Sequence, residues 1–207
     1  MRSIRLIDEA IRITVGLRLG LILRGTSLSM WHNSRLIGIY GLSCKRSTGC
    51  STRHHQINHA TRRALKRANG PATKEHQRTC SEAIKKRSDG LTSVPWQSGR
   101  RLTWDVIVVD TLTNSYTSNT SVTIRGTAEA AAMQKSVVIQ SHIFVPIAIE
   151  TLGPFDIDGQ RLFDSLGERL SSISSDPSEI SVLYQNISVL YQVFNLVAFR
   201  GSSQPRQ

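Results

Sequence analysis

Two aspartates flank a predicted β-hairpin in the middle of the 207-residue chain. Residues 91–96 and 102–109 are predicted strands, the second rich in β-branched residues, and residues 97–99 form the turn between them. Asp89 precedes the first strand and Asp105 lies inside the second, so antiparallel pairing can bring both carboxylates to one side of a sheet. Two negative carboxylates that lie close together repel each other unless they share a cation. Their oxygen ligands suit a hard ion such as Mg²⁺, so the arrangement suggests a metal site. The alternative to a metal site is that one aspartate is an exposed turn acid and the other caps a strand. The spacing of the residues alone favours this alternative.

The sequence around these acids resembles the restriction-endonuclease-like, PD-(D/E)XK fold. It is more closely similar to the nuclease-like C-terminal region of reverse-transcriptase polyproteins from invertebrate retroelements. Those proteins carry RPDG, a strand, a tryptophan and a glycine, and then LTWDVTVV. This chain has RSDG at residues 87–90, Trp96, Gly99, and LTWDVIVV at residues 102–109. The similarity extends from roughly Gly16 to Phe199.

The resemblance implies metal-dependent hydrolysis of a DNA phosphodiester, with Asp89 and Asp105 as ligands of Mg²⁺, for which Mn²⁺ can substitute. The fold usually has a lysine two residues after the second acid, where this chain has Ile107. Lys135, in a later predicted helix, is the candidate for a migrated catalytic lysine; the alternative is an ordinary solvent-facing lysine. Glu75, at the end of a short first strand, is either an accessory catalytic ligand or an edge-strand charge, and the two are equally supported.

The positive charge is concentrated in the first half of the chain. The net charge is +11, with +15 in residues 1–101 and −4 in residues 102–207. Such a surface suits a polyanionic partner, with nucleic acid ahead of an anionic membrane; solubility alone is the alternative. We therefore expect DNA or another nucleic acid as partner, and no membrane. The expected phosphate contacts are Arg53, Arg62, Arg63, Lys66, Arg67, Lys85, Lys86 and Arg87.

Residues 53–69 form a predicted helix with an apolar stripe and a basic face. The stripe consists of Ile57, Ala60, Ala64, Leu65 and Ala68. The other face has cations and no acid, which favours phosphate contact over plain solvation. His55 and His59 have the i, i+4 spacing of a helical metal pair, but no third ligand is apparent, so we expect them to be surface residues.

Residues 1–52 are predicted to be a connector helix followed by an eroded zinc-knuckle-like loop. Asp8 and Glu9 argue against a transit peptide, and arginines interrupt the apolar run, so it cannot span a bilayer. In the retroelement family the similar segment joins polymerase and nuclease, so the chain resembles a fragment without its polymerase. Of the family's zinc ligands only Cys44 remains, so we expect no zinc. An odd number of cysteines, three, indicates a reducing compartment, and we expect an intracellular, nuclear protein.

The predicted order of elements is helix, strand, strand, strand, helix, strand. This is an α/β (α+β) fold with the α-β-β-β-α-β order of the restriction-endonuclease-like core, which spans residues 53–150. It includes a predicted helix at 127–139 and an apolar strand at 142–150 that is buried on both faces. Residues 151–200 are predicted to be a helical cover, and residues 201–207 a disordered tail.

Two helices are predicted in this cover. The first spans residues 160–173, and its stripe consists of Leu162, Phe163, Leu166, Leu170 and Ile173. The second begins after a cap at Asp176 and runs to about Phe199. Its apolar residues are spaced alternately by three and four, and they are Ile180, Leu183, Ile187, Leu190, Phe194 and Val197. That spacing suits either a core cover or a dimer seam, and the length of a single helix favours a core cover.

Two functions of different classes are compatible with these residues. One is an active nuclease. The other is a catalytically inactive, basic nucleic-acid-binding remnant of a decayed retroelement. The lost zinc ligands, and Ser88 in the position of the family's proline, favour decay.

Overall fold

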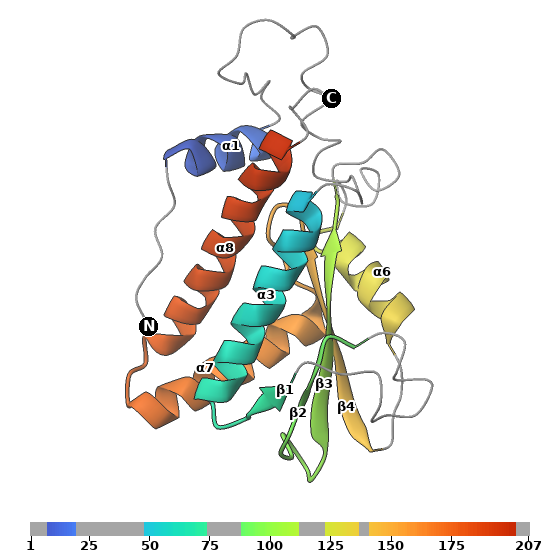
Figure 1. Ribbon diagram of the computed structural model, residues 1–207, viewed down its shortest axis with the longest axis vertical. Helices are drawn as coiled ribbons and strands as arrows, with labels where there is room; N and C mark the ends of the chain where they lie inside the picture. Colours follow the sequence, from blue (N-terminus) through green and yellow to red (C-terminus); the bar gives the residue numbers. More distant parts are fainter. Residues whose placement is uncertain (1–7, 20–47, 74–87, 112–122, 137–140, 202–207) are drawn as a thin grey trace, which may run out of the picture.

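The computed structural model describes residues 8–19, 48–73, 88–111, 123–136 and 141–201 (Figure 1). These residues form five helices and one four-stranded sheet. Some of the predicted features lie outside the described ranges. They are most of the zinc-knuckle-like loop with Cys44, the tail after residue 201, and the site residues Glu75, Lys85, Lys86 and Arg87.

The sheet has the strand order β1-β2-β3-β4. Its strands are β1 (Ala72–Thr73), β2 (Gly90–Thr92), β3 (Arg101–Val109) and β4 (His142–Glu150). β1, β2 and β3 pair antiparallel, and β4 pairs parallel to β3 over the whole length of both strands. A parallel pair needs a crossover connection, and this one contains helix α6 (Gly126–Lys135).

The predicted hairpin is present, but its first strand is shorter than expected. β2 ends at Thr92, whose hydroxyl takes over the pairing with β3 by accepting a hydrogen bond from the Leu102 amide at 3.0 Å. The same hydroxyl donates to the carbonyl of Val94 at 2.8 Å, so the chain turns away from the sheet. The turn lies at Ser98 and Gly99 as predicted, and both have positive φ (49° and 73°), as a two-residue hairpin turn requires.

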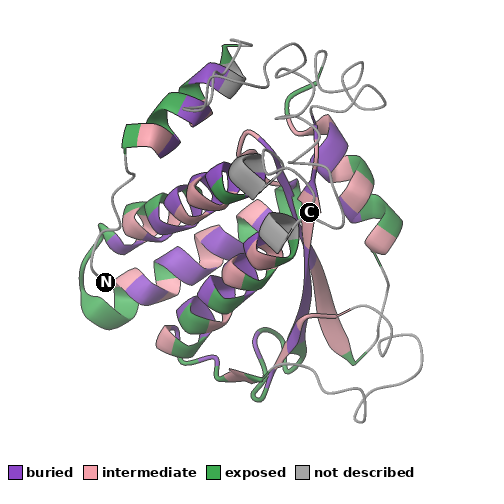
Figure 2. Cartoon of the chain, turned by 45° about the horizontal axis from the view of Figure 1, so that its top comes forward, coloured by how far each residue is buried: buried purple, intermediate pink, exposed green. Residues whose placement is uncertain are grey.

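Helices cover both faces of the sheet (Figure 1). α3 (Thr48–Arg67) and α7 (Ile157–Ser174) pack against one face, and α8 (Glu179–Gly201) packs on both of them. α6 covers the opposite face, and α1 (Asp8–Arg18) packs on α8. Figure 2 shows buried residues where these helices face the sheet and one another. The order α3-β1-β2-β3-α6-β4 is the predicted order, and the fold is α+β.

The central strand β3 sends alternate side chains to the two layers of helices. Trp104 and Val106 belong to the large core between the sheet and helices α3, α7 and α8. Ile107 and Val109 face a smaller core made with alanines of α6. Asp105 lies between Trp104 and Val106 in the strand and therefore points to the α6 side, where it is 6% exposed.

The predicted apolar stripes were largely confirmed, with two corrections. The stripe of α3 is buried throughout, although the helix begins earlier than predicted, at Thr48. On α7 the stripe is buried except for Ile173, which is 52% exposed because it lies in the last turn before the chain reverses into α8. On α8 the buried side is displaced from the prediction, so that Tyr191 and Asn195 are buried while Val197 is 40% exposed. α8 packs on α3 and α7, as a core cover would.

Helix α8 is long and apolar enough to cross a membrane by length and composition alone, over Glu179–Ala198. Here 44% of that segment is buried inside the protein. Leu183, Ile187 and Tyr191 lie in the main core. This packing accounts for a large part of the apolar character of the helix.

The helix predicted near the N-terminus is present as α1, and it packs on α8. Ala10 and Ile13 are buried. The hydroxyl of Thr14 donates a hydrogen bond to the side-chain oxygen of Gln192 at 3.0 Å, which ties α1 to α8.

The start of α7 depends on a buried carboxylate. Asp156 is the N-cap of the helix, and it is fully buried. Its two oxygens accept hydrogen bonds from the amides of Ala148, at 2.7 Å, and Gly159, at 3.0 Å. Burial raises the pKa of Asp156 from 3.8 to about 6, against the opposing effect of these two amides. Asp156 thus joins the end of β4 to the helix that covers it.

We expect the stability contributed by Asp156 to fall as the pH rises through its folded-state pKa of about 6. Its pKa is higher in the folded than in the unfolded protein, so the folded state binds more protons between pH 4 and 6, and ionisation there costs stability. Asp156→Asn keeps one acceptor but does not titrate. Urea titrations of both proteins give the difference in unfolding free energy, natural protein minus Asp156→Asn. This difference should decrease by up to about 2 kcal/mol from pH 4 to pH 7. A difference that does not change with pH would contradict the burial effect.

Candidate metal centre

Asp89 and Asp105 meet at the edge of the sheet where β2 begins. The register pairs Gly90 with Trp104, so the next position along places Asp89 across from Asp105. The Asp89 amide donates to the carbonyl of Trp104 at 2.8 Å, which continues the pairing by one residue. The Asp89 carboxylate accepts a hydrogen bond from the Val106 amide at 2.8 Å. The carboxylate thus serves as the acceptor that a backbone carbonyl of a neighbouring strand would otherwise provide. The prediction that the two carboxylates converge is confirmed.

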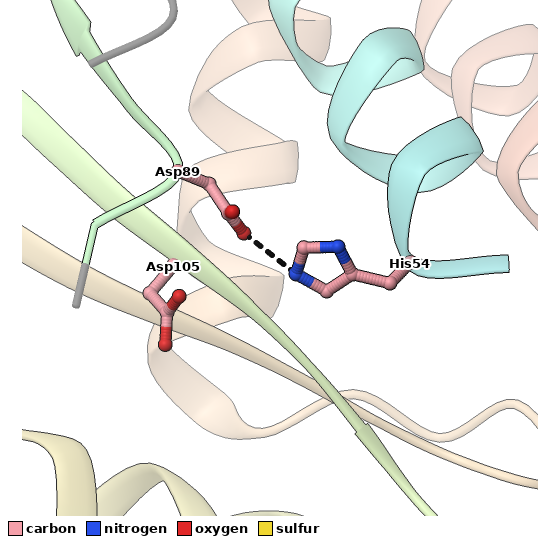
Figure 3. Close-up of side chains that lie close together, drawn as sticks. All are labelled: His54, Asp89 and Asp105. Carbon is pink, nitrogen blue, oxygen red and sulfur yellow. Dashed lines mark ion pairs between the residues drawn. The ribbon is translucent and has the colours of Figure 1, made fainter. Parts of the chain in front are cut away.

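His54 completes a group of three possible metal ligands (Figure 3). Its Nε2 lies 2.9 Å from Oδ2 of Asp89. One ligand atom from each of His54, Asp89 and Asp105 can be chosen so that all lie within 4.8 Å of one another. The side chains of His54 and Asp89 are 30% and 18% exposed, so water or a ligand can reach the group from one side.

Sequence reasoning missed His54 and weighed its neighbours instead. His55 and His59 have helical i, i+4 spacing, but both are exposed, as expected. The signal for His54 was the apolar stripe of α3: residue 54 lies three before Ile57 and seven before Thr61, both fully buried. Extending that stripe by one turn toward the N-terminus would have placed His54 against the sheet.

Lys135 reaches the group from the opposite layer. It is the last residue of α6, and its ammonium forms an ion pair with Oδ2 of Asp105. The helix ends here and not near residue 139 as predicted, because the next residue, Ser136, has extended backbone. The structure thus brings together Asp89, Asp105 and Lys135 of the predicted site and adds His54.

The charges of the group are coupled. The hydrogen bond with Asp89 raises the pKa of His54, and partial burial opposes the rise. Burial raises the pKa of Asp105, and the adjacent Lys135 ammonium lowers it again. Two carboxylates are therefore held close together beside two basic side chains.

The donor set fits a hard or borderline divalent ion. Carboxylate oxygens are the usual protein ligands of Mg²⁺ and Mn²⁺, and a neutral imidazole can complete the set. Two ligands at right angles, each about 2.1 Å from an ion, lie about 3.0 Å apart. The 2.9 Å between His54 and Asp89 is close to that spacing. Asp89 and Asp105 would hold the ion, with His54 beside them.

Trp104 fixes the hairpin against α3 next to this group. Its indole is fully buried and donates a hydrogen bond to the side-chain oxygen of Asn58 at 3.0 Å. Asn58 lies one turn after His54 on α3. The ring also fills the space over Gly90, where an added Cβ would lie 2.2 Å from Cζ2 of Trp104. The buried Trp104 ring therefore requires a residue without a side chain at position 90, directly after Asp89.

One of the predicted phosphate contacts is wrong. Arg53 is only 1% exposed, and its guanidinium bonds the side-chain oxygen of Asn195 and lies 5.2 Å from the centre of the Tyr191 ring. It occupies the buried side of α3, where no phosphate can reach it. Arg67 is half-buried and forms an ion pair with Glu179, so part of its charge is already offset.

The remaining described cations of α3 lie at or near the surface. Arg63 and Lys66 are exposed, and Arg62 is half-buried. Arg62 lines a hollow of about 310 Å³ together with His55, Gln56, Asn58 and His59. The lining of the hollow starts at His55, directly after His54, and Arg62, Arg63 and Lys66 lie two to three turns farther along the same helix.

No protein-family model matches the chain, and no curated protein matches it either. The similarity to retroelement nucleases accordingly stays a prediction from the motifs. The geometry of His54, Asp89, Asp105 and Lys135 is therefore the basis for assigning a chemistry to the chain.

Proposed function

We propose that this chain is a retroelement-derived, metal-dependent DNA endonuclease domain with a restriction-endonuclease-like core. The observation that carries the proposal is the meeting of Asp89, Asp105 and Lys135 at the open edge of β3. Asp89 lies directly before β2, Asp105 in β3, and Lys135 at the end of α6. An exposed turn acid, a strand-capping acid and a solvent-facing lysine would have no reason to meet, so their meeting favours a shared site.

Each side chain has a distinct role in this proposal. Asp89 and Asp105 would hold a divalent ion, which would supply a bound water of lowered pKa and positive charge for the scissile phosphate. Lys135 holds the carboxylate of Asp105 in place and adds a positive charge at the point where an anionic nucleophile forms. Arg62, Arg63 and Lys66 contact the DNA backbone beside the centre. Access to chromosomal DNA would place the protein in the nucleus.

A supercoiled plasmid tests this function. We expect the purified protein to convert supercoiled plasmid to open circles with Mg²⁺ or Mn²⁺ and to stop when EDTA is added. A preparation that binds plasmid but never nicks it, with either ion, would refute the endonuclease and leave the binding function.

That second function, nucleic-acid binding without catalysis, has one specific observation in its favour. The Ser88 hydroxyl is one of several buried polar groups among the described residues that find no hydrogen-bond partner. A buried polar group without a partner is unfavourable, which suits a sequence that has drifted from proline at this position. Binding without nicking is the outcome that this alternative predicts.

DNA binding should depend steeply on salt through Arg62, Arg63 and Lys66. Each phosphate contact releases roughly 0.9 counterion, so replacing all three by alanine should reduce the slope of log K against log salt by roughly 2 to 3. Fluorescence anisotropy with a labelled duplex, from low to physiological salt, measures the slope. Arg161→Ala is the matched control, because it removes a cation from α7 whose side chain is 75% exposed. Equal slopes for the triple variant and the natural protein would show that α3 is not the DNA-binding surface.

A further inference from the structure

We propose that His54 is the third ligand of the metal centre and that its imidazole makes the centre prefer Mn²⁺ to Mg²⁺. The proposal rests on the proposed metal centre, but it does not require DNA cleavage. It names the residue that determines which ion the site takes.

The position of His54 supports ligation. Its Nε2 is 2.9 Å from Oδ2 of Asp89, which is close to the separation of two neighbouring ligands on one ion. Asp105 supplies a third ligand atom within 4.8 Å of the other two. The three side chains come from α3, the start of β2 and the middle of β3, so each reaches the centre from a different element (Figure 3).

The backbone that carries His54 is firmly held. On one side of it in the sequence, Arg53 is buried against Asn195 and Tyr191 of α8. Farther along the helix, Ile57 is fully buried, and Asn58 accepts the hydrogen bond from Trp104. An imidazole on a well-packed helix is positioned before an ion arrives, and such preorganisation is what a ligand needs.

The chemistry of the imidazole decides the preference. Mg²⁺ is a hard ion that favours oxygen ligands and keeps several waters, so a nitrogen ligand adds little to its affinity. A first-row transition ion gains more from an imidazole, and the two carboxylates keep the site suitable for Mn²⁺. With Asp89 and Asp105 alone, the centre would discriminate weakly between the two ions.

The simpler interpretation is that His54 only forms an ion pair with Asp89. Both interpretations predict contact between the two side chains, but only ligation predicts a bond from nitrogen to the ion. Bound Mn²⁺ is paramagnetic, and electron spin-echo spectroscopy detects ¹⁴N modulation from a directly bonded imidazole. The natural protein loaded with Mn²⁺ should show this modulation.

Metal titrations of variants complete the experiment. We expect the natural protein to bind Mn²⁺ about tenfold or more tightly than Mg²⁺, measured by the Mn²⁺ resonance and by Mg²⁺ competition. His54→Ala should lose roughly tenfold or more in Mn²⁺ affinity, should change little toward Mg²⁺, and should lose the ¹⁴N modulation. His59→Ala, which removes an exposed histidine of the same helix, should behave as the natural protein.

The outcomes separate this proposal from the proposed function. If Mn²⁺ binds and Asp105→Asn abolishes binding, but the natural protein shows no ¹⁴N modulation, His54 is not a ligand while the metal centre stands. An unchanged preference in His54→Ala would overturn the proposal in the same way. Binding of neither ion to the natural protein would remove both the metal centre and the role of His54. Because the spectrum of the natural protein decides by itself, a poorly folded variant cannot obscure the result.

Discussion

Asp105→Asn is expected to abolish metal-dependent nicking, with a loss on the order of 10³-fold or more. Asp105 is 6% exposed, forms an ion pair with the Lys135 ammonium, and would be a ligand of the ion. Asparagine has nearly the same shape but no charge, so it weakens the hold on the ion and leaves Lys135 without its partner. The rate at which supercoiled plasmid becomes open circle, at saturating Mg²⁺ and at saturating Mn²⁺, measures the loss.

Asp158→Asn is the matched control for this change. It removes the same charge from α7, where the Asp158 side chain is 57% exposed and pairs only loosely with Arg161 at 3.2 Å. Its nicking rate should equal that of the natural protein. If Asp105→Asn retains more than about a tenth of the natural rate, the carboxylate of Asp105 is not a ligand that the reaction depends on.

Gly90→Ala is expected to destabilise the protein by about 3 kcal/mol or more. The new Cβ would lie 2.2 Å from Cζ2 and 2.4 Å from Cη2 of Trp104, distances that no relaxed structure contains. The indole cannot move aside easily, because it is fully buried and bonded to Asn58. Urea unfolding followed by tryptophan fluorescence measures the change in unfolding free energy.

Gly99→Ala separates this clash from the general cost of replacing a glycine. Gly99 has φ of 73°, so alanine is strained there, but no atom lies within 4 Å of the added Cβ. The expected cost is about 1 kcal/mol. Trp104→Phe in the Gly90→Ala background should recover part of the loss, so the two changes should be strongly non-additive. A cost for Gly90→Ala no larger than that for Gly99→Ala would show that the strand can yield beneath the indole.

The fold could be predicted where the pattern is local. The strand predicted at 142–150 is found at His142–Glu150, because an apolar run of this length is typical of a buried strand, but only its second half, residues 146–150, is buried, and residues 142–145 are half-buried. The first hairpin strand was predicted too long, because its end is set by the Thr92 hydroxyl and its bond to Leu102, ten residues away. The Thr92 hydroxyl replaces a backbone carbonyl as hydrogen-bond acceptor, and the alternation of apolar and polar residues does not reveal such a replacement.

The site could be predicted only in part for a related reason. Antiparallel pairing of β2 and β3 brings Asp89 and Asp105 together. The hairpin is recognisable in the sequence, so this approach could be predicted. Arg53 was wrongly placed at the surface because its partner Asn195 is 142 residues away, and charge was taken as a sign of exposure. His54 was overlooked because helical spacing among histidines drew the interpretation to His55 and His59. Both errors concern which side of α3 faces the protein.

The two layers that hold the centre differ in how firmly they are attached. α3 is anchored by fully buried Ile57, Ala64 and Leu65, whereas α6 buries only Thr127, Ala128 and Ala132, all small side chains. We therefore expect local opening of α6 to cost less free energy than opening of α3. Lys135 sits at the end of the weaker helix. Opening of α6 would take the ammonium away from Asp105 while the imidazole on α3 stayed in place.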